Sequence, residues 1–274
     1  MESKKVIVPV DFTPASDQAI SQAIQIATKS GFAILLFHVI GNDSRSSGNA
    51  RIQETEANLE SLSLKIREAG VDSSYRIAKG SIFDEIPAFA NTTSESLLLI
   101  GTHGIRGVKQ KLLGADVLKI VRKINIPCLI VQHECVDRKF NPIVLPVGGH
   151  EGFRILVEAT SWMAGLYDAE VHIYSVVRKG DPEHERIREN TLFAEKSFSE
   201  KSIRFKRVRE ESSIVSVGFA KQTLQYANQN TAGLLAVMSV KSEEHYHVAQ
   251  ADKENMINNE FNIPILLVNG KQLY

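Results

Sequence analysis

The chain has 274 residues, with 32 Lys and Arg against 32 Asp and Glu, and 43% of its residues are hydrophobic. This is the composition of an ordinary globular protein, and the length suggests about two domains. A net charge of zero argues against a protein whose main role is to hold DNA, RNA or an anionic membrane, because these partners are attracted by basic excess. Neither nucleic acid nor a membrane is therefore expected as a partner.

The cysteine count limits the cellular setting. Cys128 and Cys135 are too few for a disulfide framework, and no Cys/His cluster has the spacing of a zinc site. The N-terminus lacks the long apolar stretch of a signal peptide, and the apolar runs stop far short of about 20 residues. We therefore expect a cytoplasmic protein without a membrane span or a structural metal. Cys128 is expected in the core, and Cys135 in a linker.

The two halves of the sequence resemble each other at a fixed offset of 137 residues. Residues 6–10 fall on residues 143–147, residues 97–100 on 234–237, and residues 126–131 on 263–268, with no insertion. A repeat of this length indicates a duplicated domain, because solenoid repeats are much shorter. The predicted domains are residues 1–137 and 138–274.

Within the first half, short apolar runs alternate with segments of helical period, which is typical of a parallel sheet covered by helices. The predicted strands are residues 5–10, 33–40, 73–78, 97–101 and 127–132. Between them, Thr13 and Pro14 mark the start of the first helix and Gly31 its end, while Gly70 closes the second. The third helix carries Ile82, Ile86 and Phe89, and the fourth carries Val117, Ile120, Val121 and Ile124. The same order recurs in the second half, which predicts two tandem doubly wound five-stranded parallel sheets.

Ligands of open parallel sheets bind beyond the carboxyl ends of the strands, where the strand order reverses. Asp11 follows the first strand there, and a glycine-rich segment beginning at Gly101 follows the fourth. Glycines let backbone N–H groups approach a ligand closely, and the N-terminus of the next helix adds partial positive charge, so this segment suits phosphate. The Walker A and dinucleotide-binding patterns are both absent, which removes the main support for a kinase, a GTPase or a dehydrogenase.

At these positions the sequence resembles the universal stress protein family in its tandem form. The family's nucleotide-binding members have Pro-x-Asp at the end of the first strand and Gly-x2-Gly-x9-Gly-Ser/Thr after the fourth. Here these are Pro9-Val10-Asp11 and Gly101-x2-Gly104-x9-Gly114-Ala115. The resemblance implies the fold of the adenine nucleotide alpha hydrolases, with strand order 3-2-1-4-5. It also implies an intrachain pseudo-dimer of the two halves.

The resemblance further implies ATP or AMP as the ligand, with or without Mg²⁺. Asp11 would hold the ribose hydroxyls, and Pro9, Val10 and Val39 would line the adenine. The phosphates would be contacted by Gly101, His103, Gly104, Gly114 and Ala115. A carboxylate accepts from hydroxyls and backbone N–H groups donate to phosphate oxygens, so the residue types suit these roles.

Two departures concern the phosphates. Ala115 stands where the family has Ser or Thr, and the lost hydroxyl is worth about 1.5 to 3 kcal/mol of binding. Asp116 adds a negative charge beside it. In the second half none of the phosphate-contacting residues is kept, and Gly148 stands at the position of Asp11. We expect that half to be structural or to bind a partner.

Each residue also has a structural interpretation. Asp11 is a common type of helix cap, and the glycines suit tight turns. His38 and His103 are expected to pack or to donate hydrogen bonds, since no recognisable catalytic motif includes them. The segment from Glu243 to His247 is expected as a polar loop more than as a metal site. The basic run 204–209 is expected on an edge strand, where charge blocks further strand pairing.

The favoured hypothesis is a regulatory or stress-response protein that binds an adenine nucleotide in its first half and is not an enzyme. An unidentified protein partner would read the nucleotide-bound state, and a homodimer of the chain stays open. The alternative is a nucleotide-independent interaction or scaffold protein in which both pockets have lapsed. Slow ATP hydrolysis is a third hypothesis, for which no catalytic base is identified.

Overall fold

The computed structural model of the chain describes residues 4–41, 49–93, 95–102, 114–132, 139–178, 185–212, 220–239 and 248–270. These residues form two compact units, one within residues 4–132 and the other within residues 139–270. The predicted boundary between residues 137 and 138 lies outside the described residues.

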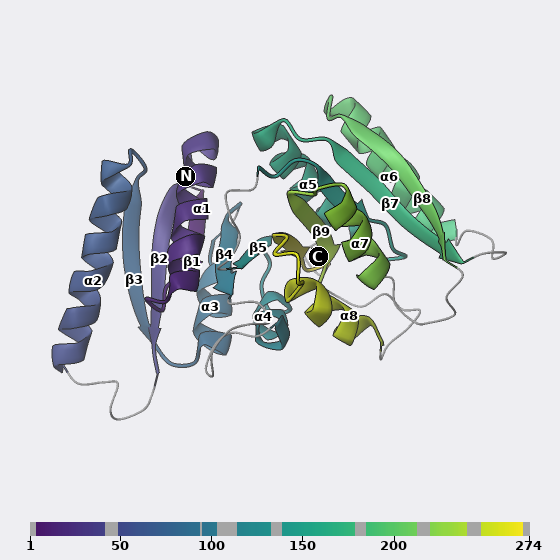
Figure 1. Ribbon diagram of the computed structural model, residues 1–274. Coiled ribbons are helices and arrows are strands. Elements are labelled where there is room, and N and C mark those ends of the chain that lie inside the picture. The colour runs from purple at the N-terminus through teal and green to yellow at the C-terminus, as the bar shows by residue number, and fades with distance from the viewer. Residues whose placement is uncertain are drawn as a thin grey trace. The chain divides into compact units, whose positions relative to one another are not determined.

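The first unit is a five-stranded parallel sheet with four helices (Figure 1). Its sheet has the strand order β3-β2-β1-β4-β5, so the predicted order 3-2-1-4-5 is confirmed. The elements are β1 (Lys5–Pro9), α1 (Pro14–Ser30), β2 (Ala33–Ile40), α2 (Asn49–Glu68), β3 (Ser73–Lys79), α3 (Ile82–Ala90), β4 (Leu97–Thr102), α4 (Gly114–Val121) and β5 (Cys128–Gln132).

The second unit repeats this arrangement. Its strands are parallel in the order β8-β7-β6-β9-β10. The elements are β6 (Ile143–Pro146), α5 (Phe153–Tyr167), β7 (Val171–Arg178), α6 (Glu185–Glu200), β8 (Phe205–Ser212), α7 (Ala220–Gln229), β9 (Leu234–Met238), α8 (Val248–Ile257) and β10 (Ile265–Val268). The predicted pseudo-dimer packing of the two halves stays a prediction.

The local signals in the sequence predicted the ends of the first two helices correctly. Thr13 is the N-cap of α1 with Pro14 as its first residue, and Gly31 ends the helix in the left-handed region at φ 73°. Gly70, with φ 83°, follows α2 in the same way. The fourth helix is shorter than predicted, since it ends at Val121 and Ile124 lies beyond it.

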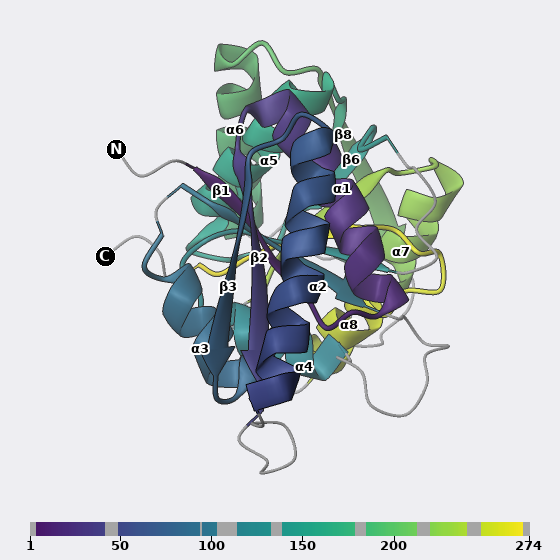
Figure 2. The same ribbon diagram turned by 90° about the vertical axis from the view of Figure 1, so that its left-hand side faces the viewer.

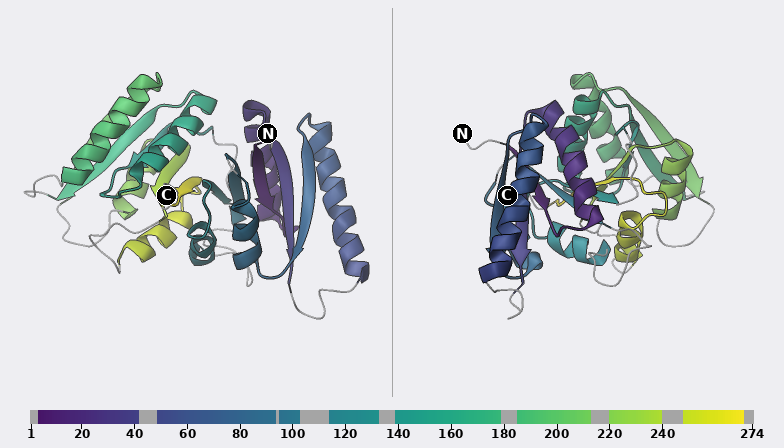
Figure 3. Two further views of the ribbon diagram at one scale, coloured as in Figure 1. Left: turned by 180° about the vertical axis from the view of Figure 1, so that it is seen from behind. Right: turned by 60° about the vertical axis from the view of Figure 1, so that its left-hand side comes forward.

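The helices of the first unit cover the two faces of its sheet. Figures 2 and 3 show α1 and α2 on the same face. On the opposite face, α3 packs against β2, where the ring of Phe89 stacks on that of Phe37 with centroids 5.0 Å apart, and α3 also packs against α4. Strand residues between the layers, such as Val6, Ile34 and Leu98, are fully buried. The hydrophobic effect of this burial is the main force that holds the layers together.

One feature of the predicted repeat is wrong. The offset of 137 residues holds for β2 and β7, because Ile34 and Val171 begin equivalent pairings. It places the equivalent of Ser73 at residue 210, whereas Phe205 occupies that position in the sheet. The path through α6 is thus five residues shorter than the path through α2, and the chain regains these residues before β9.

The basic run 204–209 lies at the edge of the sheet in the second unit. β8 is the edge strand of its sheet, as the basic run 204–209 predicted. Arg204 and Arg207 of this run form ion pairs with Asp168 and Glu195.

Across the ranges that the structure describes, no helix is both long and apolar enough to cross a membrane.

Candidate functional site

The carboxyl end of β1 in the first unit carries the most complete group of predicted site residues. β1 ends at Pro9, and Phe12 then takes a left-handed conformation with φ 59°. That region is unfavourable for a bulky side chain by about 1 to 2 kcal/mol. It turns the chain sharply from β1 into α1, so that Asp11 lies at the turn.

The carboxylate of Asp11 is oriented by Thr13. Its Oδ1 accepts a hydrogen bond from the Thr13 backbone N–H at 3.1 Å and another from the Thr13 hydroxyl at 2.5 Å. No residue of the described ranges donates a hydrogen bond to the other carboxylate oxygen, Oδ2. The Asp11 side chain is exposed to solvent. The helix cap is thus Thr13 and not Asp11, which binds the capping residue through one oxygen while the other oxygen is available to a ligand with hydroxyl groups.

Val10 differs from its neighbours in the predicted adenine-lining set. Its N–H donates to the Phe37 carbonyl at 2.9 Å, and its carbonyl accepts from Nδ1 of His38 at 2.7 Å. A carbonyl cannot donate, so His38 carries its proton on Nδ1. The expectation that His38 is a hydrogen-bonding residue is confirmed. Val10 itself is buried, which leaves it a supporting position in the turn.

Pro9 and Val39 lie at the same end of the sheet. Pro9 is in register with Phe37, whose ring faces α3, and Val39 follows Phe37 by two residues. Side chains alternate between the faces of a strand, so Pro9, Phe37 and Val39 share the face covered by α3 and α4. Both Pro9 and Val39 are half-buried, which leaves part of their apolar surface accessible.

Gly101 has a clear packing role. A Cβ placed on it would lie 1.9 Å from the carbonyl oxygen of Ala15, so only glycine lets the first turn of α1 approach β4 this closely. This contact shows that Gly101 faces α1. The next residue, Thr102, therefore faces the opposite side, toward α3 and α4.

The remaining phosphate residues lie at the start of α4. Gly114 is the first residue of this helix and is buried, and Ala115 follows it half-buried. β4 and β5 are parallel, so the connecting helix starts at the carboxyl end of the sheet, near Asp11. The carboxylate of Asp116 accepts from the Lys119 ammonium at 2.9 Å, so its negative charge is partly neutralised. His103 and Gly104 lie outside the described residues.

In the second unit the equivalent turn is built differently. Gly148 has no carboxylate, and its carbonyl accepts from the Asn190 side chain at 2.8 Å, as does the His150 carbonyl at 3.1 Å. Met238 stands where the first unit has Gly101, and its side chain is buried. The residues that α5 and β9 present are thus unlike those of the predicted nucleotide site. Lys241 and the segment 243–247 lie outside the described residues.

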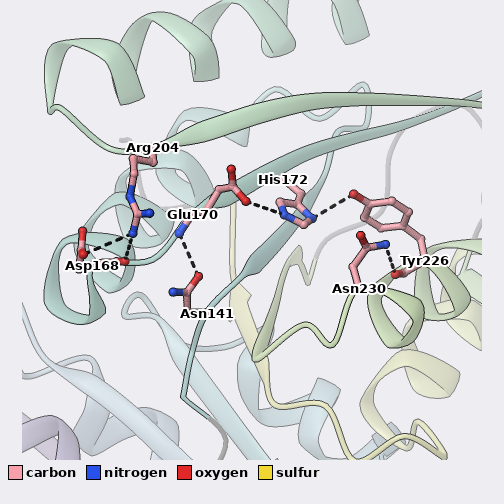
Figure 4. A network of polar contacts seen from close by, with 7 residues as sticks. All are labelled: Asn141, Asp168, Glu170, His172, Arg204, Tyr226 and Asn230. Carbon is pink, nitrogen blue, oxygen red and sulfur yellow. Dashed lines mark hydrogen bonds and ion pairs between the residues drawn. The ribbon is translucent and has the colours of Figure 1, made fainter.

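The second unit also contains a buried polar network that the sequence analysis missed (Figure 4). His172 on β7 contacts the Glu170 carboxylate through Nε2 at 3.2 Å and the Tyr226 hydroxyl through Nδ1 at 3.0 Å. The ring of Tyr226 stacks on that of Tyr174, whose hydroxyl donates to Glu210 at 2.7 Å.

Burial and the nearby Lys206 lower the pKa of His172, against the opposing effect of Glu170. The neutral ring then donates from Nε2 to Glu170 and accepts at Nδ1 from Tyr226. The repeat held the signal for this network, because His172, Tyr174 and Tyr226 stand where the first half has Leu35, Phe37 and Phe89. A stacked aromatic pair is kept, and polar groups are added around it.

Comparison with known proteins gives the family of the first half. The model of the universal stress protein family matches residues 2–132. A universal stress protein of Synechocystis sp., Sll1388, is 25% identical over 150 residues, which are 47% of this chain and 97% of that protein. Relatives of this kind are therefore about half as long as this chain.

Solved structures extend the likeness to the whole fold. A universal stress protein from Archaeoglobus fulgidus DSM 4304 has a TM-score of 0.75 at 16% identity and covers 98% of this chain and 100% of its own. A universal stress protein in complex with cAMP covers 48% of this chain, with a TM-score of 0.39 and 23% identity. The first of these shows that two such halves in one chain form a known fold.

Proposed function

We propose that the chain, which belongs to the universal stress protein family, binds an adenine nucleotide, ATP or AMP, in its first half. It would act there as a cytoplasmic regulatory protein and not as an enzyme. The observation that carries the proposal is the orientation of Asp11, whose Oδ1 is held by Thr13 while Oδ2 accepts from no described residue. A carboxylate held in this way is preorganised to accept ribose hydroxyls.

The surroundings of Asp11 suit the other parts of a nucleotide. Pro9 and Val39 offer apolar surface to a base on the same face of the sheet, and the N-terminus of α4 offers backbone N–H groups and partial positive charge to phosphates. No group of three His, Cys, Asp or Glu side chains in the described ranges is placed to hold a metal ion.

The hydrogen bonding of His38 supports the proposed regulatory role. His38, the histidine nearest to Asp11 in the described part of the site, donates to Val10 and serves the turn. Binding would favour one conformation of the site and so change a surface that a protein partner recognises, because a ligand favours the conformation that it binds better. The second half would contribute structure or a partner surface.

A scaffold protein without a nucleotide is the second candidate. It is favoured by the fact that two site residues have structural roles, since Asp11 binds Thr13 and Gly101 accommodates Ala15. These contacts would be kept for stability even if the pocket had lapsed.

Calorimetric titration separates the two candidates. Nucleotide-free protein is titrated with MgATP, AMP and cAMP, and we expect about one site per chain. Asp11→Asn keeps an oxygen that accepts from Thr13 but removes the charge and the second acceptor oxygen, and should weaken binding at least tenfold. Asp17→Asn, on the exposed first turn of α1, is the matched control. Absence of binding by the natural protein would favour the scaffold.

A further inference from the structure

The hydroxyl of Thr102 is buried without a hydrogen-bond partner. Thr102 is the last residue of β4 and is 1% exposed, and its Oγ1 has no hydrogen-bond partner among the residues that the structure describes. An unpaired hydroxyl in the interior costs about 1 to 3 kcal/mol, so such groups are rare and call for an explanation. Its backbone, in contrast, is paired with Gln132 of β5.

The position of this hydroxyl is defined by the residue before it. Gly101 faces Ala15 of α1, so Thr102 faces the side of the sheet covered by α3 and α4, which it shares with Pro9 and Val39. β1 and β4 are parallel neighbours, with Ile7 in register with Leu98, so Thr102 and Asp11 come at the ends of these strands, at the same edge of the sheet. The hydroxyl therefore belongs to the same edge of the sheet as the Asp11 carboxylate and the start of α4.

This geometry points to a role for Thr102 in the nucleotide site. We propose that Thr102 donates its hydroxyl to the nucleotide and so replaces the hydroxyl that the family has at the position of Ala115. The inference rests on the proposed function of the first half. It explains in one step why a hydroxyl is buried unpaired at this place and how the site tolerates Ala115.

The second half offers a matched control. Ser239 lies 137 residues after Thr102, at the end of β9, and its hydroxyl is likewise fully buried and unpaired among the described residues. The neighbouring positions carry Met238 and Gly148 in place of Gly101 and Asp11. Ser239 thus shares with Thr102 a buried, unpaired hydroxyl at the end of an equivalent strand, but its half lacks the carboxylate of Asp11 and the glycine at residue 101.

The test compares Thr102→Val and Ser239→Ala in full-length protein by calorimetric titration with MgATP and by thermal unfolding without nucleotide. Valine has nearly the volume of threonine but no hydroxyl. We expect both variants to unfold at the same temperature as the natural protein or higher, because each loses an unpaired buried hydroxyl. Nucleotide affinity should fall tenfold to a hundredfold in Thr102→Val only, as expected for a lost hydrogen bond to a charged group.

A second comparison uses Ala115→Ser. If the hydroxyl of Thr102 replaces the one missing at residue 115, this substitution should raise affinity more in the Thr102→Val background than in the natural chain. Equal gains in both backgrounds would overturn the replacement, because independent groups add.

The outcomes also separate this inference from the function on which it rests. Binding by the natural protein with unchanged affinity in Thr102→Val would overturn the role of Thr102 and leave the nucleotide site standing. A lower unfolding temperature of Thr102→Val without nucleotide would show that the hydroxyl has a structural partner, which also overturns it. No binding by the natural protein would overturn both.

Discussion

The carbonyl oxygen of Ala15 lies 1.9 Å from the place that a Cβ at residue 101 would occupy. The first turn of α1 and the end of β4 are therefore in direct backbone contact. Asp11 lies four residues before Ala15 in the sequence, and Thr102 directly follows Gly101. A side chain at residue 101 would therefore push α1 away from β4, at the edge of the sheet where Asp11 lies.

Gly101→Ala should destabilise the first unit by about 1 to 3 kcal/mol, the usual cost of an overpacked core position. The three atoms nearest to the new methyl group, from Ala15 and Ser16, are all backbone atoms, so the strain is relieved only if the backbone of α1 or β4 moves. Urea denaturation would measure the free energy of unfolding. The control is Gly165→Ala on the exposed side of α5, where no atom lies within 4 Å of a new Cβ. There we expect a stabilisation of up to about 1 kcal/mol. Equal effects at the two glycines would contradict the packing role of Gly101.

Thr13→Val should weaken nucleotide binding about twofold to tenfold, because Asp11 loses the hydroxyl that orients its carboxylate while the backbone N–H of residue 13 still donates to it. Thr13→Ser keeps the hydroxyl and should bind like the natural protein. Calorimetric titration with MgATP measures both variants. If Thr13→Ser were as weak as Thr13→Val, the methyl group and not the hydroxyl would be the relevant part of the side chain.

The His172 network predicts a pH dependence of stability in the second unit. The folded-state pKa of His172 is lowered from its ordinary value of 6.5, chiefly by burial. Between these two pKa values the unfolded chain binds more protons than the folded one, so the free energy of unfolding falls as the pH drops below about 6.5. The stabilisation is fully present above that pH.

Urea denaturation at a series of pH values from 5 to 8 would measure this dependence. His172→Gln keeps one donor and one acceptor but does not titrate, so its stability should change less over the same range. An identical pH dependence in both proteins would show that His172 is not the group responsible. Tyr226→Phe leaves Nδ1 of His172 without its partner and should cost about 1 to 3 kcal/mol at pH 8.

Cys128 should be unreactive in the folded protein. It is fully buried on β5, and burial raises the pKa of its thiol, so almost no thiolate forms at neutral pH. In a Cys135→Ser variant, where Cys128 is the one remaining thiol, a thiol reagent should label the chain only as fast as the first unit opens. Labelling should become rapid in urea above the unfolding transition. Rapid labelling in buffer alone would place Cys128 in an accessible position.

Much of the fold was predictable from the sequence because its signals are local. The strands of the first unit are apolar runs of a few residues, and the ends of α1 are marked by Thr13, Pro14 and Gly31, all of which act on their immediate neighbours. The repeat then extends the assignment to the second half. The uniform offset fails at β8, because an offset carries no information on where helix and loop lengths change, whereas the basic run 204–209 located that strand correctly.

The residues that follow the strands were also predictable, because the carboxyl ends of parallel strands always meet at one edge. This rule brought Asp11 and Gly101 together before any contact was known. The tertiary structure decided what these residues do. Gly101 accommodates Ala15, which is 86 positions away in the chain. His38 of β2 donates to the carbonyl of Val10, which follows the neighbouring strand β1.

Only the tertiary structure could identify the unpaired hydroxyl of Thr102 and the network of His172. Whether a polar group is buried and paired depends on contacts between residues distant in sequence, such as Tyr226 and His172, which are 54 residues apart. Local periodicity determines which side of a strand or helix is apolar. The atoms that meet on that side are determined by how the elements pack, and the chemistry of the site depends on those atoms.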